Sequence, residues 1–176
     1  MKKRMKSILM GLLAVLVVIQ FIQIDKTNPE YNAANDFMNI EQPPAEVAEV
    51  LKNACYDCHS YETKYPWYTY VQPVGWWVKN HIKEGVKHLN YSKWGEYTAK
   101  RKDHKLEEMV EMVEEGEMPL NSYTWGHPEA RLTKEQRDAL INWFKEVRNR
   151  LGYASGDGGE SHRESGEEEH EEHEHD

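Results

Sequence analysis

The residues best suited to chemistry form one short motif, Cys55-Tyr56-Asp57-Cys58-His59. Its spacing is that of the Cys-x-x-Cys-His motif, which is typical of c-type haem attachment. Two thiols about one helical turn apart can add to the two vinyl groups of a haem, and the adjacent imidazole then becomes an axial ligand of the iron. The chain has no other cysteine, which excludes a multi-disulfide scaffold. We therefore predict one covalently bound haem c, attached through Cys55 and Cys58, with His59 as the proximal ligand.

Two other uses of the cysteines are open at this point. A zinc site would combine Cys55 and Cys58 with two of four histidines, namely His81, His88, His104 and His127. A thioredoxin-like redox dithiol would need a βαβ context, which the sequence does not indicate. Both readings are disfavoured if the chain is exported, because c-type haem is attached outside the cytoplasm in bacteria.

Met118 is the preferred candidate for the second axial ligand of the iron. It lies between Gly116 and Pro119 in an expected loop, where helical periodicity does not call for an apolar residue. The ring of Pro119 would stiffen the loop that presents the sulfur. Met109 and Met112 fall inside an expected helix, where a place in the core or beside it explains them better.

Two histidines are alternative candidates for the second axial ligand. His81 and His88 are seven residues apart, so they share one face of an expected helix, and either would give a bis-histidine iron. An open sixth position is the third alternative. The aromatic stretch 61–77 is expected to pack around the haem, because its rings bury large apolar areas and keep polar tips.

The elements that must position these residues are predicted to be helices. Apolar residues recur at helical spacing in four segments. These are 45–54, which leads into the motif, 74–89, which follows Pro73, 103–115 and 133–151. Thr133 with Gln136 forms a capping box, and Gly116 and Gly152 are predicted to end the third and fourth helices. No alternation of period two is evident, so the predicted fold class is all-α.

The N-terminus is predicted to be a transmembrane signal-anchor, residues 1–26. Basic residues at positions 2–6 precede an apolar run of about 17 residues, 8–24, at the lower limit for a bilayer crossing. No small-residue cleavage site follows the run, although a cleaved signal peptide is the alternative. With the basic flank inside, we expect a single-pass protein of the inner membrane whose remaining chain faces the periplasm.

The rest of the chain divides by composition into a linker at 27–44, a haem-binding domain at 45–152 and a disordered Glu/His-rich tail at 153–176. The net charge of -9 is concentrated in 157–176, where ten acidic residues accompany one base, Arg163. No basic face accumulates, so no nucleic-acid partner is expected. Loose metal binding by the tail histidines is less favoured than a solvated acidic tail; these are His162, His170, His173 and His175.

Several short motifs in residues 43–147 together resemble the bacterial haem-binding domain family. The motifs are Ala54-Cys55-Tyr56-Asp57-Cys58-His59-Ser60, Tyr65-Pro66-Trp67-Tyr68, His81-Ile82 and Glu117-Met118-Pro119. Members are short, often membrane-anchored relatives of monohaem cytochromes c. The resemblance implies a small cytochrome c-like helical domain in which Cys55 and Cys58 form the thioethers, His59 is the proximal ligand and Met118 the distal one.

These expectations together favour one-electron transfer at the periplasmic face of the membrane, with redox proteins as partners. A His/Met ligand pair saturates the iron and raises its potential, which suits an electron carrier rather than an enzyme. The alternative is a peroxidase-like haem enzyme or a small-ligand sensor, whose sixth position is open or whose sixth ligand is easily displaced.

Overall fold

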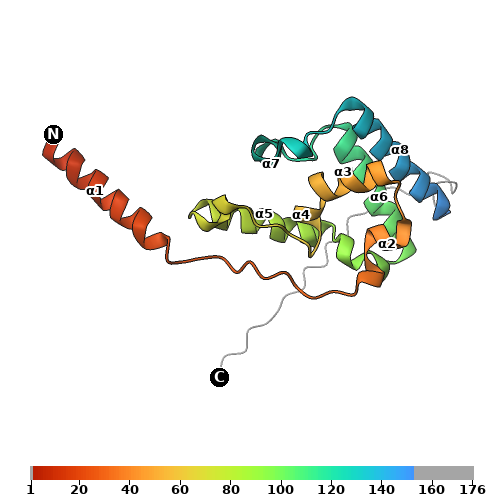
Figure 1. Ribbon diagram of the computed structural model, residues 1–176, viewed down its shortest axis with the longest axis horizontal. Coiled ribbons are helices and arrows are strands. Elements are labelled where there is room, and N and C mark those ends of the chain that lie inside the picture. Colours follow the sequence, from red (N-terminus) through yellow and green to blue (C-terminus); the bar gives the residue numbers. More distant parts are fainter. Residues whose placement is uncertain (1, 153–176) are drawn as a thin grey trace, which may run out of the picture.

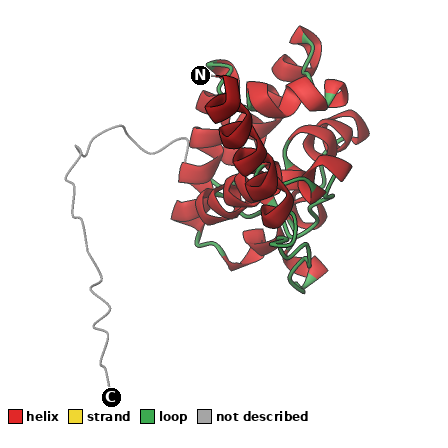
Figure 2. Cartoon of the chain, turned by 90° about the vertical axis from the view of Figure 1, so that its left-hand side faces the viewer, coloured by secondary structure: helices red, strands yellow, loops and turns green. Residues whose placement is uncertain are grey.

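The computed structural model describes residues 2–152, and within them the chain is helical, with no strand (Figure 2). The predicted all-α class is therefore confirmed. The helices are α1 Lys2–Ile19, α2 Phe37–Glu41, α3 Ala45–Ala54, α4 Tyr56–His59, α5 Val74–His88, α6 Ala99–Glu114, α7 Asn121–Gly126 and α8 Lys134–Arg150, with 3-10 turns η1 Ala33–Asn35, η2 Trp67–Tyr70, η3 Tyr91–Glu96 and η4 Pro128–Ala130. The tail expected at 153–176, with its four histidines, lies outside the described residues.

The hydrophobic core lies between α6 and α8, which pack side by side, and α3, which packs on α8 (Figure 1). The apolar faces predicted for these helices are buried, including Leu51 from α3, Leu106 from α6 and Leu140 from α8. Full burial of such a side chain stabilises the fold by about 1.5–3 kcal/mol. The core thus fixes α3, which leads directly into the cysteine motif.

The ends of the helices agree with the predicted caps, with one exception. Thr133 and Gln136 form the predicted capping box of α8, and Gly116 and Gly152 have positive φ angles of 76° and 77°. The exception is α6, which begins at Ala99 instead of residue 103, after the N-cap Thr98. The four residues before position 103 are one alanine and three basic residues, so they add nothing to the apolar period from which the start was predicted.

The segment 27–44, expected to be an irregular linker, contributes to the core. Asp36 caps the short helix α2 by accepting a bond of 2.9 Å from the Met38 amide. The next residue, Phe37, has no exposed surface, and its ring packs against Tyr91 and Trp94, in both cases with ring centroids 4.8 Å apart. Packing by a single aromatic residue on a five-residue helix leaves no periodic pattern in the sequence.

The predicted N-terminal transmembrane helix is wrong: among the described helices, none has both the length and the apolar character to cross a membrane. α1 has 18 residues, and its first five include Lys2, Lys3, Arg4 and Lys6. Only residues 7–19 remain without charge, and at about 1.5 Å per residue they span about 20 Å, less than the roughly 30 Å of a hydrocarbon core. The helix ends at Ile19, before the apolar run of the sequence does.

Candidate functional site

All four residues predicted to bind the haem line one cavity of ≈ 630 Å³. Cys55, Cys58 and His59 line it from the motif, and Met118 lines it from the loop after α6. Its volume lies within the range of about 300–1,000 Å³ that is usual for cofactor pockets. Apolar side chains form much of the remaining wall, namely Leu89, Met109, Val113, Leu120 and Phe144.

The two cysteines lie on one helical turn. The amides of Cys58 and His59 both donate to the carbonyl of Cys55, at 3.2 and 3.0 Å, which closes the turn of α4. Positions i and i+3 share a helix face, so the two thiols open toward the same cavity, and both are free. Burial raises the pKa of the Cys55 thiol to about 12 and that of the Cys58 thiol to about 11.

His59 is oriented by the backbone of α5 and its C-cap. Its Nδ1 lies 3.1 Å from the carbonyl oxygen of Gly85 and 3.3 Å from that of Leu89. Carbonyl oxygens only accept, so Nδ1 carries the proton and donates it, and Nε2 keeps the lone pair. Histidines that bind metals have this arrangement in most proteins. Burial also lowers the pKa of His59, which favours the neutral imidazole that a metal requires.

Gly85 allows α5 to approach the motif closely. A Cβ atom at this position would lie 2.2 Å from the backbone oxygen of Cys58. The absence of a side chain therefore lets the Gly85 carbonyl reach the His59 ring. The close contact with the Cys58 backbone therefore explains why a glycine occupies this position inside a helix. The apolar periodicity of the sequence does not predict such a contact.

We expect Gly85→Ala to destabilise the holoprotein by about 1–3 kcal/mol, because α5 must move away from the Cys58 backbone. In an unconstrained helix interior the same change stabilises by about 0.5–1 kcal/mol. Urea unfolding followed by far-UV circular dichroism measures the difference. Gly11→Ala is the matched control, since a Cβ there meets no atom within 4 Å. An unchanged urea midpoint for Gly85→Ala would show that the close approach is not required.

The three methionines near the cavity differ in their surroundings. The sulfur of Met109 accepts a bond of 3.1 Å from the Tyr91 hydroxyl, and its side chain is buried in the core, as expected for a core residue. Met118 is partly buried against the same core, and its amide donates to the Met112 carbonyl at 3.0 Å. Met112 also lines the cavity. Two thioethers, those of Met112 and Met118, thus have no protein hydrogen bond among the described residues.

His81 and His88 both line the cavity from one face of α5, as their spacing predicted. His81 Nδ1 is 2.9 Å from the Trp77 carbonyl oxygen, and its ring lies 4.2 Å from that of Trp77. The side chain of His88 is 74% exposed and lies 3.9 Å from Glu84. His88 is therefore at the solvent side of the cavity, and both imidazoles have other partners among the described residues.

The zinc and dithiol alternatives lack support in residues 2–152. Over that part of the chain, no three His, Cys, Asp or Glu side chains lie close enough to hold a metal ion. His104 pairs with Glu108 at 3.3 Å, and His127 lies 2.7 Å from the Tyr68 hydroxyl. The βαβ context of a thioredoxin-like dithiol needs strands, and the described residues have none.

The aromatic stretch 61–77 does not line the cavity, which contradicts the prediction that it packs around the haem. Much of it is at the surface: the exposed fractions are 78% for Trp67 and 50% for Trp77. The aromatic residues of the cavity wall are Tyr91, Tyr123 and Phe144, which the sequence analysis did not assign to the site. Tyr123 lies on a six-residue helix, too short to produce a periodic pattern.

Comparison with known families supports the same cofactor. The model of a family described as "Haem-binding domain" matches residues 14–146, well over half of the chain. No curated protein and no solved structure matches the chain. The matched range contains Cys55, Cys58, His59 and Met118.

Proposed function

The chain belongs to the haem-binding domain family, and on this basis we propose that it binds one haem c covalently and transfers single electrons. The observation that carries the proposal is the setting of His59. Its Nδ1 is held by two backbone carbonyls, and the ring lines an apolar cavity together with both free thiols and Met118. The donor set and the cavity volume therefore fit a haem.

Four residues would bind the haem, each in a different role. The Cys55 and Cys58 thiols would each add across a vinyl group, with sulfur bonding to one carbon and the thiol hydrogen moving to the other. Nε2 of His59 and the thioether of Met118 would bind the iron, and the apolar wall would exclude water from it. When bound, the haem supplies an iron that cycles between the ferrous and ferric states.

Covalent haem attachment bears on where the protein works and on its partners. Covalent haem attachment in bacteria takes place outside the cytoplasm, so we propose that the domain works on the periplasmic side. A carrier needs a donor and an acceptor, and we propose that both are redox proteins. The thioether of Met118 would favour ferrous iron and give a relatively high potential.

Carbon monoxide separates the carrier from a haem enzyme or sensor. We expect the dithionite-reduced holoprotein to keep its absorption spectrum after addition of carbon monoxide, because two protein ligands would saturate the iron. The measurement is a difference spectrum in the Soret region, with the nitrogen-flushed sample as reference. Rapid appearance of the spectrum of a carbon monoxide complex would indicate an open sixth position or an easily displaced sixth ligand. That result would contradict the electron-carrier function and favour a haem enzyme or sensor.

A further inference from the structure

The short helix α7, Asn121–Gly126, follows Met118 after only Pro119 and Leu120. None of its residues is buried, and Trp125 is 85% exposed. Apolar packing therefore contributes little to the position of α7. The adjacent Met118 loop is held at one end by the bond of the Met118 amide to the Met112 carbonyl, 3.0 Å, and at the other end by the contacts that hold α7.

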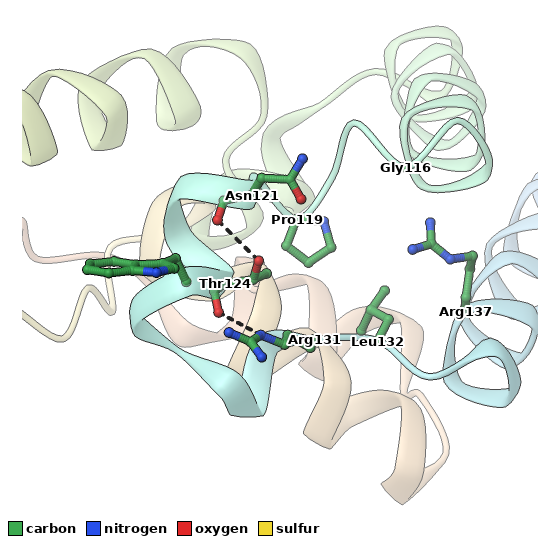
Figure 3. Close-up of a pocket in the computed structure, with 8 residues that line it drawn as sticks. Gly116, Pro119, Asn121, Thr124, Arg131, Leu132 and Arg137 are labelled. Carbon is green, nitrogen blue, oxygen red and sulfur yellow. Dashed lines mark hydrogen bonds between the residues drawn. The ribbon is translucent and has the colours of Figure 1, made fainter.

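α7 lies between two cavities. Tyr123 lines the larger cavity, with Cys58 and His59. Asn121 and Thr124 line a second cavity of ≈ 380 Å³ (Figure 3). Arg131 borders that second cavity, and its Nε donates to the Thr124 carbonyl at 2.9 Å. α7 thus borders both cavities, and polar bonds contribute much of what holds it in place.

The strongest of these bonds joins α7 to the cysteine motif. The Tyr123 hydroxyl donates to Oδ2 of Asp57 at 2.8 Å, and Asp57 stands directly before Cys58. The other carboxylate oxygen, Oδ1, accepts a bond of 3.1 Å from the Lys64 amide, which fixes the orientation of the carboxylate. A hydrogen bond to an ionised acceptor is about twice as strong as a neutral one.

A second contact holds the C-terminal end of α7. The ring of its C-cap residue, His127, stacks on Tyr123, with centroids 4.3 Å apart and planes at 13°. Nε2 of His127 lies 2.7 Å from the Tyr68 hydroxyl, and Nδ1 lies 2.9 Å from Glu129. Tyr68 belongs to η2, which follows the cysteine motif in the chain. Tyr123 is therefore the central member of the contacts that hold α7.

We propose that Tyr123 is a positioning residue for the distal ligand: its hydrogen bond to Asp57 holds α7 against the cysteine motif and thereby keeps Met118 on the haem iron. The inference rests on the proposed function, in which Met118 is that ligand. Without this bond α7 opens more often, because no buried side chain opposes the opening. Each opening loosens the Met118 loop, since only two residues separate it from α7 and, among the described residues, only the Met112 carbonyl then holds its backbone.

Imidazole binding to the ferric holoprotein measures this opening. An external ligand binds only when Met118 has left the iron, so its apparent dissociation constant falls as the open fraction rises. We expect Tyr123→Phe to tighten imidazole binding by about tenfold to a hundredfold, the range expected for the loss of a hydrogen bond to a charged group. Asp57→Asn, which removes the charge from the acceptor, is expected to shift binding in the same direction. It provides an independent measurement if Tyr123→Phe retains too little haem.

Two controls isolate the mechanism. Tyr31→Phe removes a tyrosine–carboxylate bond, to Glu62, away from the cavity, and is expected to leave imidazole binding unchanged. In a Met118→Ala background, Tyr123→Phe is expected to have no further effect, because there is no distal sulfur left to position. Equal tightening in that background would show that Tyr123 controls access to the cavity and would overturn the proposal.

The outcomes separate the inference from the function on which it rests. If the wild type binds imidazole as tightly as Met118→Ala does, Met118 is not the ligand, and that part of the proposed function fails. If Met118→Ala binds tightly while Tyr123→Phe and Asp57→Asn behave as the wild type, Met118 is the ligand and only the positioning role is wrong.

Discussion

The double variant Cys55→Ser, Cys58→Ser is expected to lose all of its haem on a denaturing gel or in acid–acetone extraction, whereas the wild type keeps its haem on the polypeptide. Both thiols lie on one helical turn at the cavity and are free to form thioethers. Serine hydroxyls do not add to vinyl groups under the same conditions, so the variant can hold haem only by non-covalent contacts. Haem staining and the pyridine haemochrome spectrum measure the difference.

Single variants give the graded control for this experiment. Cys55→Ser and Cys58→Ser each leave one thiol in the cavity, so each should retain haem through a single thioether, with a shifted haemochrome band. Release of all haem from the wild type would show that the haem is not covalently attached and that the protein binds haem non-covalently. Unchanged covalent haem in the double variant would show that neither cysteine forms the link.

The local part of the site could be predicted from the sequence, because the cysteines and His59 lie within five consecutive residues that follow an amphipathic helix. The partners of His59 could not. The carbonyls of Gly85 and Leu89, which set its tautomer, come from 26 and 30 residues further along the chain. Backbone carbonyls occur at every position, so residue types give no signal for such contacts.

The N-terminal prediction failed because α1 begins with basic residues and ends at Ile19, just before residues that make tertiary contacts. The apolar run 8–24 suggested a continuous span, but tertiary contacts involve Gln20 and Gln23 in its second half. The Gln20 side chain accepts from the Gln72 amide at 2.9 Å, and that of Gln23 donates to the Tyr70 carbonyl at 3.2 Å. These bonds join the chain just after α1 to Tyr70 in η2 and to Gln72, which lies two residues before α5 begins. A mean hydropathy over the run 8–24 averages over these two glutamines and contains no information about the residues they contact.

The aromatic residues show that residue type alone predicts neither burial nor a place at the site, since Trp67 and Trp125 are 78% and 85% exposed. The density of aromatic residues in 61–77 predicts that this stretch packs around the haem, because aromatic rings bury large apolar areas. The fold instead exposes Trp67 and brings the more isolated Tyr91 and Tyr123 to the cavity. Tyr91 enters from η3 and Tyr123 from α7, neither of which has an apolar period in the sequence.

Met118→Ala is expected to change the haem spectrum and lower the reduction potential by on the order of a hundred millivolts or more. A thioether is a soft, neutral ligand that favours ferrous iron, so its loss favours the ferric state. The weak absorption band at the red edge of the visible range, which reports an iron–sulfur bond in ferric haem, should disappear. The reduced variant should bind carbon monoxide at once. Spectroelectrochemical titration and carbon monoxide difference spectra provide the two readouts.

Met112→Ala is the matched control, because Met112 lines the same cavity and also has a thioether. Met118 follows α6 in a loop between Gly116 and Pro119, whereas Met112 is held within the last turns of α6. We therefore expect Met112→Ala to keep the red band and nearly the wild-type potential. If Met112→Ala abolishes the band and Met118→Ala does not, the ligand is the helical methionine. If only His81→Ala or His88→Ala changes spectrum and potential, the iron has two histidine ligands, and the high potential expected of a His/Met carrier no longer follows.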